Sequence, residues 1–240
     1  MYEPGMTARK VAVFNPAIFD KAKALLDQYP WTDKHKRKGD NTYLLYLPNS
    51  PERIAGFYDI TGPITKPMVD LMCAFRQPIN YLMRLTGIAD PVLVQADIAR
   101  MEPGGDTQMH TDTRYTQRYS RRYNIAIDTN PDCYLYHVSY DLENGGVRDH
   151  IEPGELWELN NKIEHTAVNY GTTWRTHMII DVMPRNYYER MWEKFPNAFG
   201  KVPNIQGKNN TYDLDKDGNM LNYWTLFNDL PHCFPARTHV

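Results

Sequence analysis

The segment from Pro91 to Pro184 alternates short apolar stretches with turn residues, and this alternation constrains the fold more than any other feature. Clusters rich in Pro, Gly, Asn and Asp, such as Glu102–Asp106, separate the apolar stretches. Short strands at near-regular spacing are typical of sandwiches and jelly rolls, whereas βαβ units would place a helix between strands. The strands that we expect are Val92–Met101, Arg122–Thr129, Cys133–Val138, Glu155–Leu159, Thr166–Tyr170 and Thr173–Met183.

The sequence on either side of this segment predicts helices. Apolar residues recur at helical spacing between Asn15 and Pro30 and again from Pro67, with a second helix restarting at Pro78. A short helix is expected at Tyr187–Phe195, followed by an irregular tail. We therefore expect a mainly β protein with helices: a helical segment at 1–90 that packs on the core, a jelly-roll core at 91–185, and a C-terminal helix and tail at 186–240.

Composition excludes several classes of protein. The 240 residues carry a formal net charge of −2, so the basic surface expected of a nucleic-acid-binding protein is missing. No apolar stretch approaches 18 residues and Met1–Phe14 has no apolar core of a signal peptide, so we expect neither a membrane span nor secretion. The three cysteines, Cys73, Cys133 and Cys233, are too few and too widely spaced for a disulfide framework or a zinc site. These features predict a cytoplasmic protein.

The pattern His110-Thr111-Asp112, with His165 lying 55 residues after His110, is the main candidate for chemistry. Residues i and i+2 of a strand project from one face, so His110 and Asp112 would aim at one point. Two histidines and one carboxylate form the facial triad that binds Fe(II) and leaves positions open for substrate and oxygen. The alternative is that the pattern arises by chance and that these histidines are structural.

Arg175 strengthens the metal hypothesis. It lies ten residues after His165 in a strand that continues into the apolar run Met178–Val182. A guanidinium in a core strand is costly to bury unless an anion pairs with it, and its planar fork matches a carboxylate. A metal and an inward-facing arginine together suit a dicarboxylate cosubstrate such as 2-oxoglutarate. The alternative is a structural ion pair with Asp181 or a neighbouring glutamate.

Other candidate sites are weaker. Asp213–Gly218 resembles the start of an EF-hand loop, but Trp224 stands where the bidentate glutamate belongs, which favours a surface turn. The basic run Lys34–Lys38 is interpreted as a solvated loop rather than an anion site. His137 and His150 lack ligand partners at strand spacing, so we expect surface or packing roles. His177 shares a strand face with Arg175 and is expected to support it or to face the substrate.

The order of several motifs resembles the aspartyl/asparaginyl β-hydroxylase-like family of Fe(II)/2-oxoglutarate-dependent oxygenases, which have a double-stranded β-helix fold. The resemblance covers Val92 to about Arg185, and its motifs are Met101–Gly104, His110–Asp112, Arg121–Ile127, Gly154–Asn161 with Glu164-His165, and Asn169, Arg175 and Ile179–Val182. It implies that His110 and His165 bind iron and that Arg175 binds the distal carboxylate of 2-oxoglutarate. It also implies that Arg122 and Asn124 lie near the other carboxylate.

The chain departs from the family's animal members at two positions. Those peptidyl-aspartate hydroxylases lack a carboxylate ligand, whereas Asp112 is suited to supply one. In this respect the chain is more similar to bacterial members that hydroxylate free amino acids such as proline. A serine that helps to hold 2-oxoglutarate in the animal enzymes is replaced by Ala99. Both departures weaken the inference that this chain shares the peptidyl-aspartate substrate of the animal members.

The function that we expect is a dioxygenase dependent on Fe(II), 2-oxoglutarate and O2, which hydroxylates an amino acid or a peptidyl side chain. His110, Asp112 and His165 would bind the metal, and Arg175, Arg122 and Asn124 the cosubstrate. The expected partner is a small-molecule or peptide substrate, without nucleic acid or membrane. Two alternatives stay open: a non-catalytic jelly-roll module that binds a small anion, and a cupin-like enzyme that does not use 2-oxoglutarate. Arg175 argues against the second.

Overall fold

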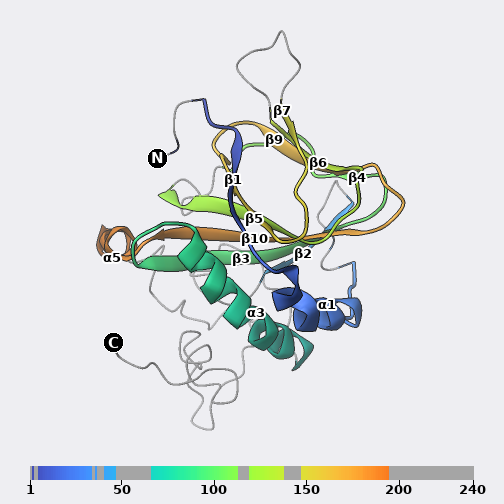
Figure 1. Cartoon of the computed structure of the whole chain (residues 1–240), viewed down its shortest axis with the longest axis horizontal. Helices are drawn as coiled ribbons and strands as arrows, with labels where there is room; N and C mark the ends of the chain where they lie inside the picture. The colour runs from blue at the N-terminus through green and yellow to red at the C-terminus, as the bar shows by residue number, and fades with distance from the viewer. Residues whose placement is uncertain are drawn as a thin grey trace, which may run out of the picture.

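Two antiparallel β-sheets face each other in the part of the chain that the structure describes. The computed structural model describes residues 2, 5–33, 36, 41–46, 66–112, 119–137 and 147–194. The main sheet has the order β1-β8-β5-β10-β3-β2, and the smaller sheet has the order β4-β9-β6-β7. Helices α1 and α3 cover the outer face of the main sheet, and the smaller sheet lies on its opposite side (Figure 1). This arrangement confirms the expected jelly-roll core with a helical layer.

The described strands and helices follow one another mostly as the sequence pattern predicts. The strands are β1 (Ala8–Val13), β2 (Thr42–Tyr46), β3 (Pro91–Met101), β4 (Gly105–Asp106), β5 (Arg121–Asp128), β6 (Cys133–His137), β7 (Val147–Asp149), β8 (Glu155–Leu159), β9 (His165–Asn169) and β10 (Arg175–Pro184). The helices are η1 (Pro16–Phe19), α1 (Asp20–Asp27), α3 (Lys66–Leu85) and α5 (Arg185–Lys194).

Strand β10 shows how the main sheet separates a hydrophobic core from an interior cavity. It pairs with β5 on one side and with β3 on the other. Met178, Ile180 and Val182 point toward the helices and join the core that includes Leu71, Phe75 and Leu82. Because side chains alternate between the faces of a strand, the intervening positions point between the two sheets. These positions are Arg175, His177, Ile179 and Asp181.

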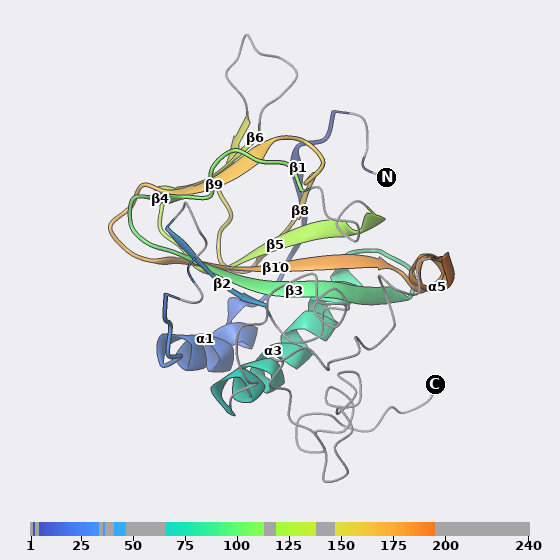
Figure 2. The same cartoon turned by 180° about the vertical axis from the view of Figure 1, so that it is seen from behind.

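Helix α3 runs without interruption through Pro78, which differs from the expected restart of a new helix at that residue. Proline removes one backbone hydrogen bond inside a helix and strains the preceding turn. Leu71, Phe75, Ile79 and Leu82 nevertheless form one buried stripe, with spacings that keep them on a single helix face. Packing of this stripe against the main sheet therefore holds the helix together across the proline (Figure 2).

Two strands lie within the segment that the sequence predicts to be helical. β1 pairs with β8, and β2 pairs with β3, so each is at an edge of the main sheet. The expectation that residues 1–90 contribute only helices is therefore wrong. Both strands are short, and their partners lie more than 50 residues away, so no local pattern reveals the pairing. The domain boundaries at residues 90 and 185 stay a prediction.

Some sequence expectations fall outside the described residues, among them the EF-hand-like segment Asp213–Gly218 and most of the basic run Lys34–Lys38. None of the described helices has the length and apolarity needed to cross a membrane. Cys133 is a buried free thiol. Cys73 is disulfide-bonded, which the small number and wide spacing of the cysteines did not lead us to expect.

Candidate metal centre

His110 and His165 are brought together by the backbone. Their main chains exchange two hydrogen bonds, from His110 N to His165 O (3.0 Å) and from His165 N to His110 O (2.9 Å). The two rings lie with their centroids 4.5 Å apart. His165 is the first residue of β9, whereas His110 makes only an isolated bridge, so the expected regular strand at His110–Asp112 is wrong.

The backbone before His110 explains the difference. Gln108 adopts a φ of 54°, and its N–H donates to Oδ1 of Asp106 (2.8 Å) in a turn that ends β4. Beyond this turn the backbone forms hydrogen bonds again, between His110 and His165 and from Asp112 N to Asn161 O (3.0 Å). The side chains of His110 and Asp112 still converge, although this segment does not form a regular strand.

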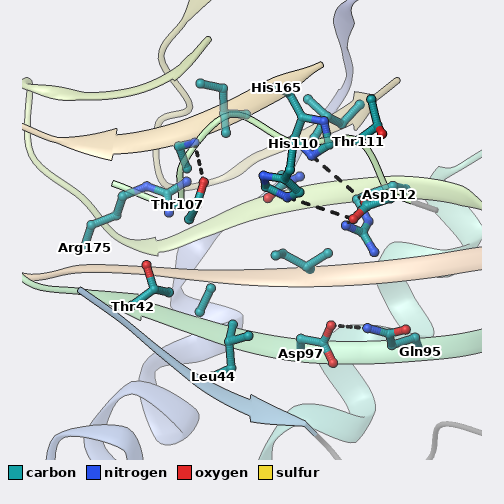
Figure 3. Close-up of a pocket in the computed structure, with 17 residues that line it drawn as sticks. Thr42, Leu44, Gln95, Asp97, Thr107, His110, Thr111, Asp112, His165 and Arg175 are labelled. Atoms are coloured by element: carbon teal, nitrogen blue, oxygen red, sulfur yellow. Dashed lines mark hydrogen bonds and ion pairs between the residues drawn. The ribbon is translucent and has the colours of Figure 1, made fainter. Parts of the chain in front are cut away.

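His110, Asp112 and His165 offer ligand atoms that all lie within 4.8 Å of one another. Nε2 of His110 lies 4.0 Å from Oδ1 of Asp112, and Nε2 of His165 lies 4.0 Å from Oδ2. Figure 3 shows the three side chains converging on one point at the roof of a cavity. The structure therefore brings together all three residues that the sequence predicts to bind metal.

Hydrogen bonds set both imidazoles in the tautomer that a metal requires. Nδ1 of His110 lies 2.9 Å from Gln108 O, and Nδ1 of His165 lies 2.9 Å from Ile163 O. A carbonyl oxygen only accepts, so each Nδ1 donates and carries the ring proton. Each Nε2 then presents its lone pair to the centre, as in metal sites whose histidines are oriented by the surrounding backbone. Burial lowers the pKa of His165 to about 4, so its ring is neutral near pH 7.

Asp112 is held as a carboxylate by its neighbours. Oδ2 accepts a hydrogen bond from Nδ2 of Asn161 (3.1 Å) and another from Nη1 of Arg122. Burial raises the pKa of Asp112, but the Arg122 guanidinium and the other polar neighbours outweigh it, so the pKa lies below its usual value. With Oδ2 held in this way, Oδ1, which lies 4.0 Å from Nε2 of His110, is the oxygen better placed to bind a metal.

Arg122 joins this carboxylate to the main sheet. Its Nε and Nη2 donate to the two oxygens of Asp181 on β10, at 2.9 and 2.8 Å. Its remaining amino group donates to Asp112, so one buried guanidinium connects the half-buried carboxylate of Asp112 to the buried carboxylate of Asp181. The sequence predicts that Arg122 binds the cosubstrate, and that role stays a prediction. In the structure its contacts orient the metal-binding carboxylate. Asn124, two residues further along β5, lines the cavity.

Arg175 stands at the start of β10 with only 2% of its surface exposed. Its Nη2 contacts Nδ1 of His177 (2.9 Å), but its Nε is buried without a hydrogen-bond partner. Burial lowers the pKa of Arg175 to about 10, so the guanidinium still carries its charge near pH 7. The alternative pairing with Asp181 is not observed: six residues of extended strand separate the two side chains, roughly 20 Å, and Asp181 pairs with Arg122. No described carboxylate forms an ion pair with Arg175.

A cavity of about 340 Å³ joins Arg175 to the three candidate ligands. Its floor comes from β2, β3, β5 and β10 of the main sheet, and its roof from β9 and the segment around His110 (Figure 3). Besides the residues already described, its lining consists of Thr42, Leu44, Gln95, Asp97, Ala99, Thr107, Thr111, Leu135, Leu159, Ala167 and Ile179. One cavity therefore holds the candidate metal-binding set and a buried cation for which no described carboxylate is a partner.

The other histidines have the supporting roles that the sequence favours. His137 is 1% exposed and packs beside His165, with ring centroids 6.2 Å apart. Nδ1 of His150 lies 2.7 Å from Cys133 O at the edge of the smaller sheet. His177 supports Arg175 rather than lining the cavity. The sequence assigned no role to Asn161, although this residue ends the motif Gly154–Asn161, and it did not single out Asp97, which stands in none of the motifs.

The comparisons with known proteins bear on the family and the fold. The model of the family described as aspartyl/asparaginyl beta-hydroxylase matches residues 79–184. That range contains all six residues predicted to bind metal or cosubstrate. No curated protein matches the sequence. The matched range is just under half of the chain and includes β3 to β10, which supply the cavity lining apart from Thr42 and Leu44 of β2.

The fold is similar to several solved structures at low sequence identity. An oxidoreductase of the 2OG-Fe(II) oxygenase family from Burkholderia pseudomallei is 12% identical, with a TM-score of 0.50, over 73% of this chain and 84% of that one. A prolyl-4-hydroxylase from Pseudomonas putida is 16% identical, with a TM-score of 0.44, over 74% of this chain and 92% of that one. HygX from Streptomyces hygroscopicus is 11% identical, with a TM-score of 0.47, over 75% and 83%. At these identities the comparison bears on the fold alone.

The fold and the site together define the class of protein, an oxygenase built on a jelly roll. The resemblance to the aspartyl/asparaginyl β-hydroxylase family is confirmed by the family match, and the chain is a hydroxylase of this general kind.

Proposed function

We propose that this protein is an Fe(II)- and 2-oxoglutarate-dependent dioxygenase that hydroxylates an amino acid or a peptidyl side chain and releases succinate and CO2. The observation that carries the proposal is the pairing of two features in one cavity. One is a set of three converging ligands, His110, Asp112 and His165. The other is Arg175, a buried guanidinium whose Nε has no partner.

The ligand residues fit Fe(II). Two neutral imidazole nitrogens and one carboxylate oxygen form the donor set of the facial triad, which leaves other coordination positions open. Both imidazoles present Nε2 because their Nδ1 protons are donated to backbone carbonyls. The ionised state of Asp112 is favoured by Arg122, so metal binding does not require the removal of a tightly held proton.

The cation at the other end of the cavity fits the cosubstrate. A buried guanidinium with an unmatched N–H is costly unless a ligand completes its hydrogen bonds. The distal carboxylate of 2-oxoglutarate would complete them in a charge-assisted pair. Thr42, at the same end of the cavity, adds a hydroxyl group to the lining. Neighbouring Ala99 lies on the cavity floor and leaves room where the family's animal members carry a serine.

The residues of the chain have separate tasks in this mechanism. When bound, Fe(II), 2-oxoglutarate and O2 supply the oxidation of an unactivated C–H bond. His110, Asp112 and His165 hold the metal, while Arg122 and Asn161 keep the Asp112 carboxylate oriented and charged. Arg175 binds and orients the cosubstrate, and apolar residues such as Leu135 and Leu159 contribute to the cavity lining.

The second candidate function is a non-catalytic module that holds a small anion at Arg175. The same unmatched Nε would favour it, but an anion module has no need of three converging ligands. A cupin-like enzyme that does not use 2-oxoglutarate would account for the three converging ligands but would have no need of Arg175. We infer a small-molecule or peptide substrate, and the cytoplasmic location stays a prediction.

The test is succinate formation from 2-oxoglutarate under air, with Fe(II) and ascorbate, across a panel of free amino acids and short peptides. We expect Fe(II)-dependent succinate that at least one substrate stimulates. His110→Ala should abolish it, and His150→Ala, which removes an imidazole outside the cavity, should leave it unchanged. Binding of 2-oxoglutarate without any succinate from folded, iron-loaded protein would favour the anion module instead.

A further inference from the structure

The N-terminal segment lies against the connection between β8 and β9, which carries residues that support the metal site. Thr7 O accepts a hydrogen bond from Asn160 N (2.8 Å), and Met6 O accepts one from Nδ2 of Asn160 (2.8 Å). The same segment brings Tyr2 into contact with Asn161, 159 residues further along the chain. The family match begins at residue 79, so it does not include these N-terminal residues.

The Tyr2 hydroxyl group bridges the two residues that hold Asp112. It accepts a hydrogen bond from Arg122 N (3.0 Å) and donates one to Oδ1 of Asn161 (3.2 Å). A backbone N–H can only donate, so the proton of the hydroxyl group is directed at Asn161. Arg122 and Asn161 are in turn the residues that donate to Oδ2 of Asp112. One side chain outside the family match therefore contacts both supports of a candidate metal ligand.

The contacts of Asn161 determine which way its amide group points. Asn161 has none of its surface exposed, and its backbone O accepts a hydrogen bond from Asp112 N (3.0 Å). Its Oδ1 accepts from Tyr2 and from Nζ of Lys162, an ammonium group that can only donate. Because both partners are donors, the amide oxygen faces them and the NH2 group faces the Asp112 carboxylate. The reversed amide would place an oxygen against that carboxylate, and a buried acceptor without a donor is costly.

Tyr2 is anchored by its ring and bonded through its hydroxyl group. Nζ of Lys162 lies over the ring, 5.6 Å from its centroid, within the range of a cation–π contact. Burial raises the pKa of the Tyr2 hydroxyl well above its ordinary value, so the group keeps its proton near pH 7 and stays a donor to Asn161. The ring therefore positions the side chain, and the hydroxyl group supplies the bond that orients the amide.

We propose that Tyr2 is a positioning residue of the metal centre, which keeps the Asn161 amide in the orientation that holds the Asp112 carboxylate. This inference rests on the proposed function, since it assigns a further support to the metal site of that function. Loss of a group bonded directly to a metal ligand typically weakens metal binding by about 10–100-fold. Tyr2 is one hydrogen bond further from the metal, so loss of its hydroxyl group should weaken binding by less, roughly three- to tenfold.

The experiment titrates full-length, metal-free protein with Co(II) under anaerobic conditions. Co(II) accepts the same nitrogen and oxygen donors as Fe(II), and its visible d–d bands report the ligand geometry. Tyr2→Phe keeps the ring and removes only the hydroxyl group. Arg9→Gln is the structural control, since it removes an ion pair that joins β1 to Glu158 of β8 (2.9 Å). His110→Ala shows whether the titrated metal is bound at the candidate centre.

We expect Tyr2→Phe to raise the Kd for Co(II) roughly three- to tenfold and to change the intensity of the d–d bands. Arg9→Gln should lower the Tm of the metal-free protein but keep the wild-type Kd. The Tyr2 hydroxyl group is then removed in the background of Asn161→Leu, or of Asn161→Ala if the first variant does not fold. Because Tyr2 acts through Asn161, its loss should have no further effect on the Kd in that background.

The outcomes distinguish a failure of this inference from a failure of the proposed function. An unchanged Kd in folded Tyr2→Phe, or an equal rise of the Kd in Tyr2→Phe and Arg9→Gln, would overturn the role of Tyr2 alone. An effect of Tyr2→Phe that is as large in the Asn161→Leu background as in the wild type would do the same. Wild-type protein that binds no Co(II), or that binds it as tightly after His110→Ala, would overturn the metal centre and with it the proposed function.

Discussion

Nη1 of Arg122 donates a hydrogen bond to Oδ2 of Asp112, so a buried arginine on β5 holds the only carboxylate of the candidate metal-binding set. The same guanidinium is fixed on its other edge by both oxygens of Asp181. The position of a candidate ligand in an irregular segment is thereby tied to the centre of the main sheet. Metal affinity and folding stability should depend on the same arginine.

The first prediction concerns this arginine. Arg122→Met leaves the half-buried Asp112 and the buried Asp181 without the guanidinium that pairs with both, which should destabilise the fold by about 3–5 kcal/mol. Loss of the group that orients a metal ligand should also weaken metal binding by about 10–100-fold. Urea unfolding of the metal-free protein and metal titration measure the two effects separately.

A double variant distinguishes the effect of Arg122→Met on folding stability from its effect on metal affinity. Arg122→Met with Asp181→Asn removes one of the two stranded charges and should recover part of the stability, but not the metal affinity. Arg185→Gln is the control, because Arg185 makes an exposed pair with Asp90 at 2.8 Å. Wild-type metal affinity in Arg122→Met would show that Asp112 needs no such support.

The second prediction concerns Asp112 itself. If Asp112 is a ligand, Asp112→Ala should lose most iron binding and turnover while the protein stays folded. Asp112→Glu should rescue poorly, since an extra methylene moves the oxygen by more than the roughly 0.2 Å tolerance of metal–ligand distances. Iron stoichiometry and succinate formation at saturating 2-oxoglutarate decide the matter. Retained iron and activity in Asp112→Ala would remove Asp112 from the metal site and reopen a peptidyl-aspartate substrate.

The third prediction concerns Arg175. Its replacement by Ala removes a charge-assisted partner of 2-oxoglutarate, which should cost about 2–5 kcal/mol, or roughly 30-fold or more in KM for 2-oxoglutarate. Arg175→Lys should recover only part of this, because an ammonium group cannot form the planar fork. Steady-state kinetics with varied 2-oxoglutarate measure both variants. An unchanged KM in Arg175→Ala would return the arginine to a structural role.

The fourth prediction concerns pH. Burial lowers the pKa of His137 to about 4, from the ordinary value of 6.5 that it regains on unfolding. The unfolded state therefore binds the proton more readily, so this contribution to stability is complete above pH 6.5 and is lost as the pH falls toward 4. The difference of about 2.5 units corresponds to about 3 kcal/mol.

Urea unfolding of the metal-free protein between pH 7.5 and pH 4 measures this loss. His137→Leu removes one of the titrating groups and should make the dependence less steep, while His165 and His177, whose pKa values burial also lowers, keep the remainder of the slope. A steep loss of stability that is identical in His137→Leu and wild type would assign the pH dependence to other groups.

Much of the candidate site could be predicted because its signals are local. His110 and Asp112 are two residues apart, and an arginine leading into an apolar strand stands out whatever its partners are. The contacts of Arg122 could not be predicted, since Asp181 lies 59 residues away and only the pairing of β5 with β10 brings it close. A sequence shows that an arginine is in a strand, but not which carboxylate it meets.

Asp97 was missed for a different reason. In Val92–Met101 the polar residues Gln95 and Asp97 alternate with apolar ones, and such alternation ordinarily marks a face in contact with water. Here helix α3 covers the apolar face, and the opposite face lines the cavity, so both are buried. The edge strand β2 was missed because its five residues have no partner nearby in the sequence.

The central claim is that one cavity binds Fe(II) and 2-oxoglutarate together. Its most direct test is the visible spectrum of the protein under anaerobic conditions, with Fe(II) added first and 2-oxoglutarate second. We predict a weak charge-transfer band that develops only with both additions, saturates at one equivalent of iron, and is absent from His110→Ala. Arg175→Ala should require a far higher concentration of 2-oxoglutarate to develop it. A folded protein that binds iron but develops no band at any concentration of 2-oxoglutarate would contradict the claim.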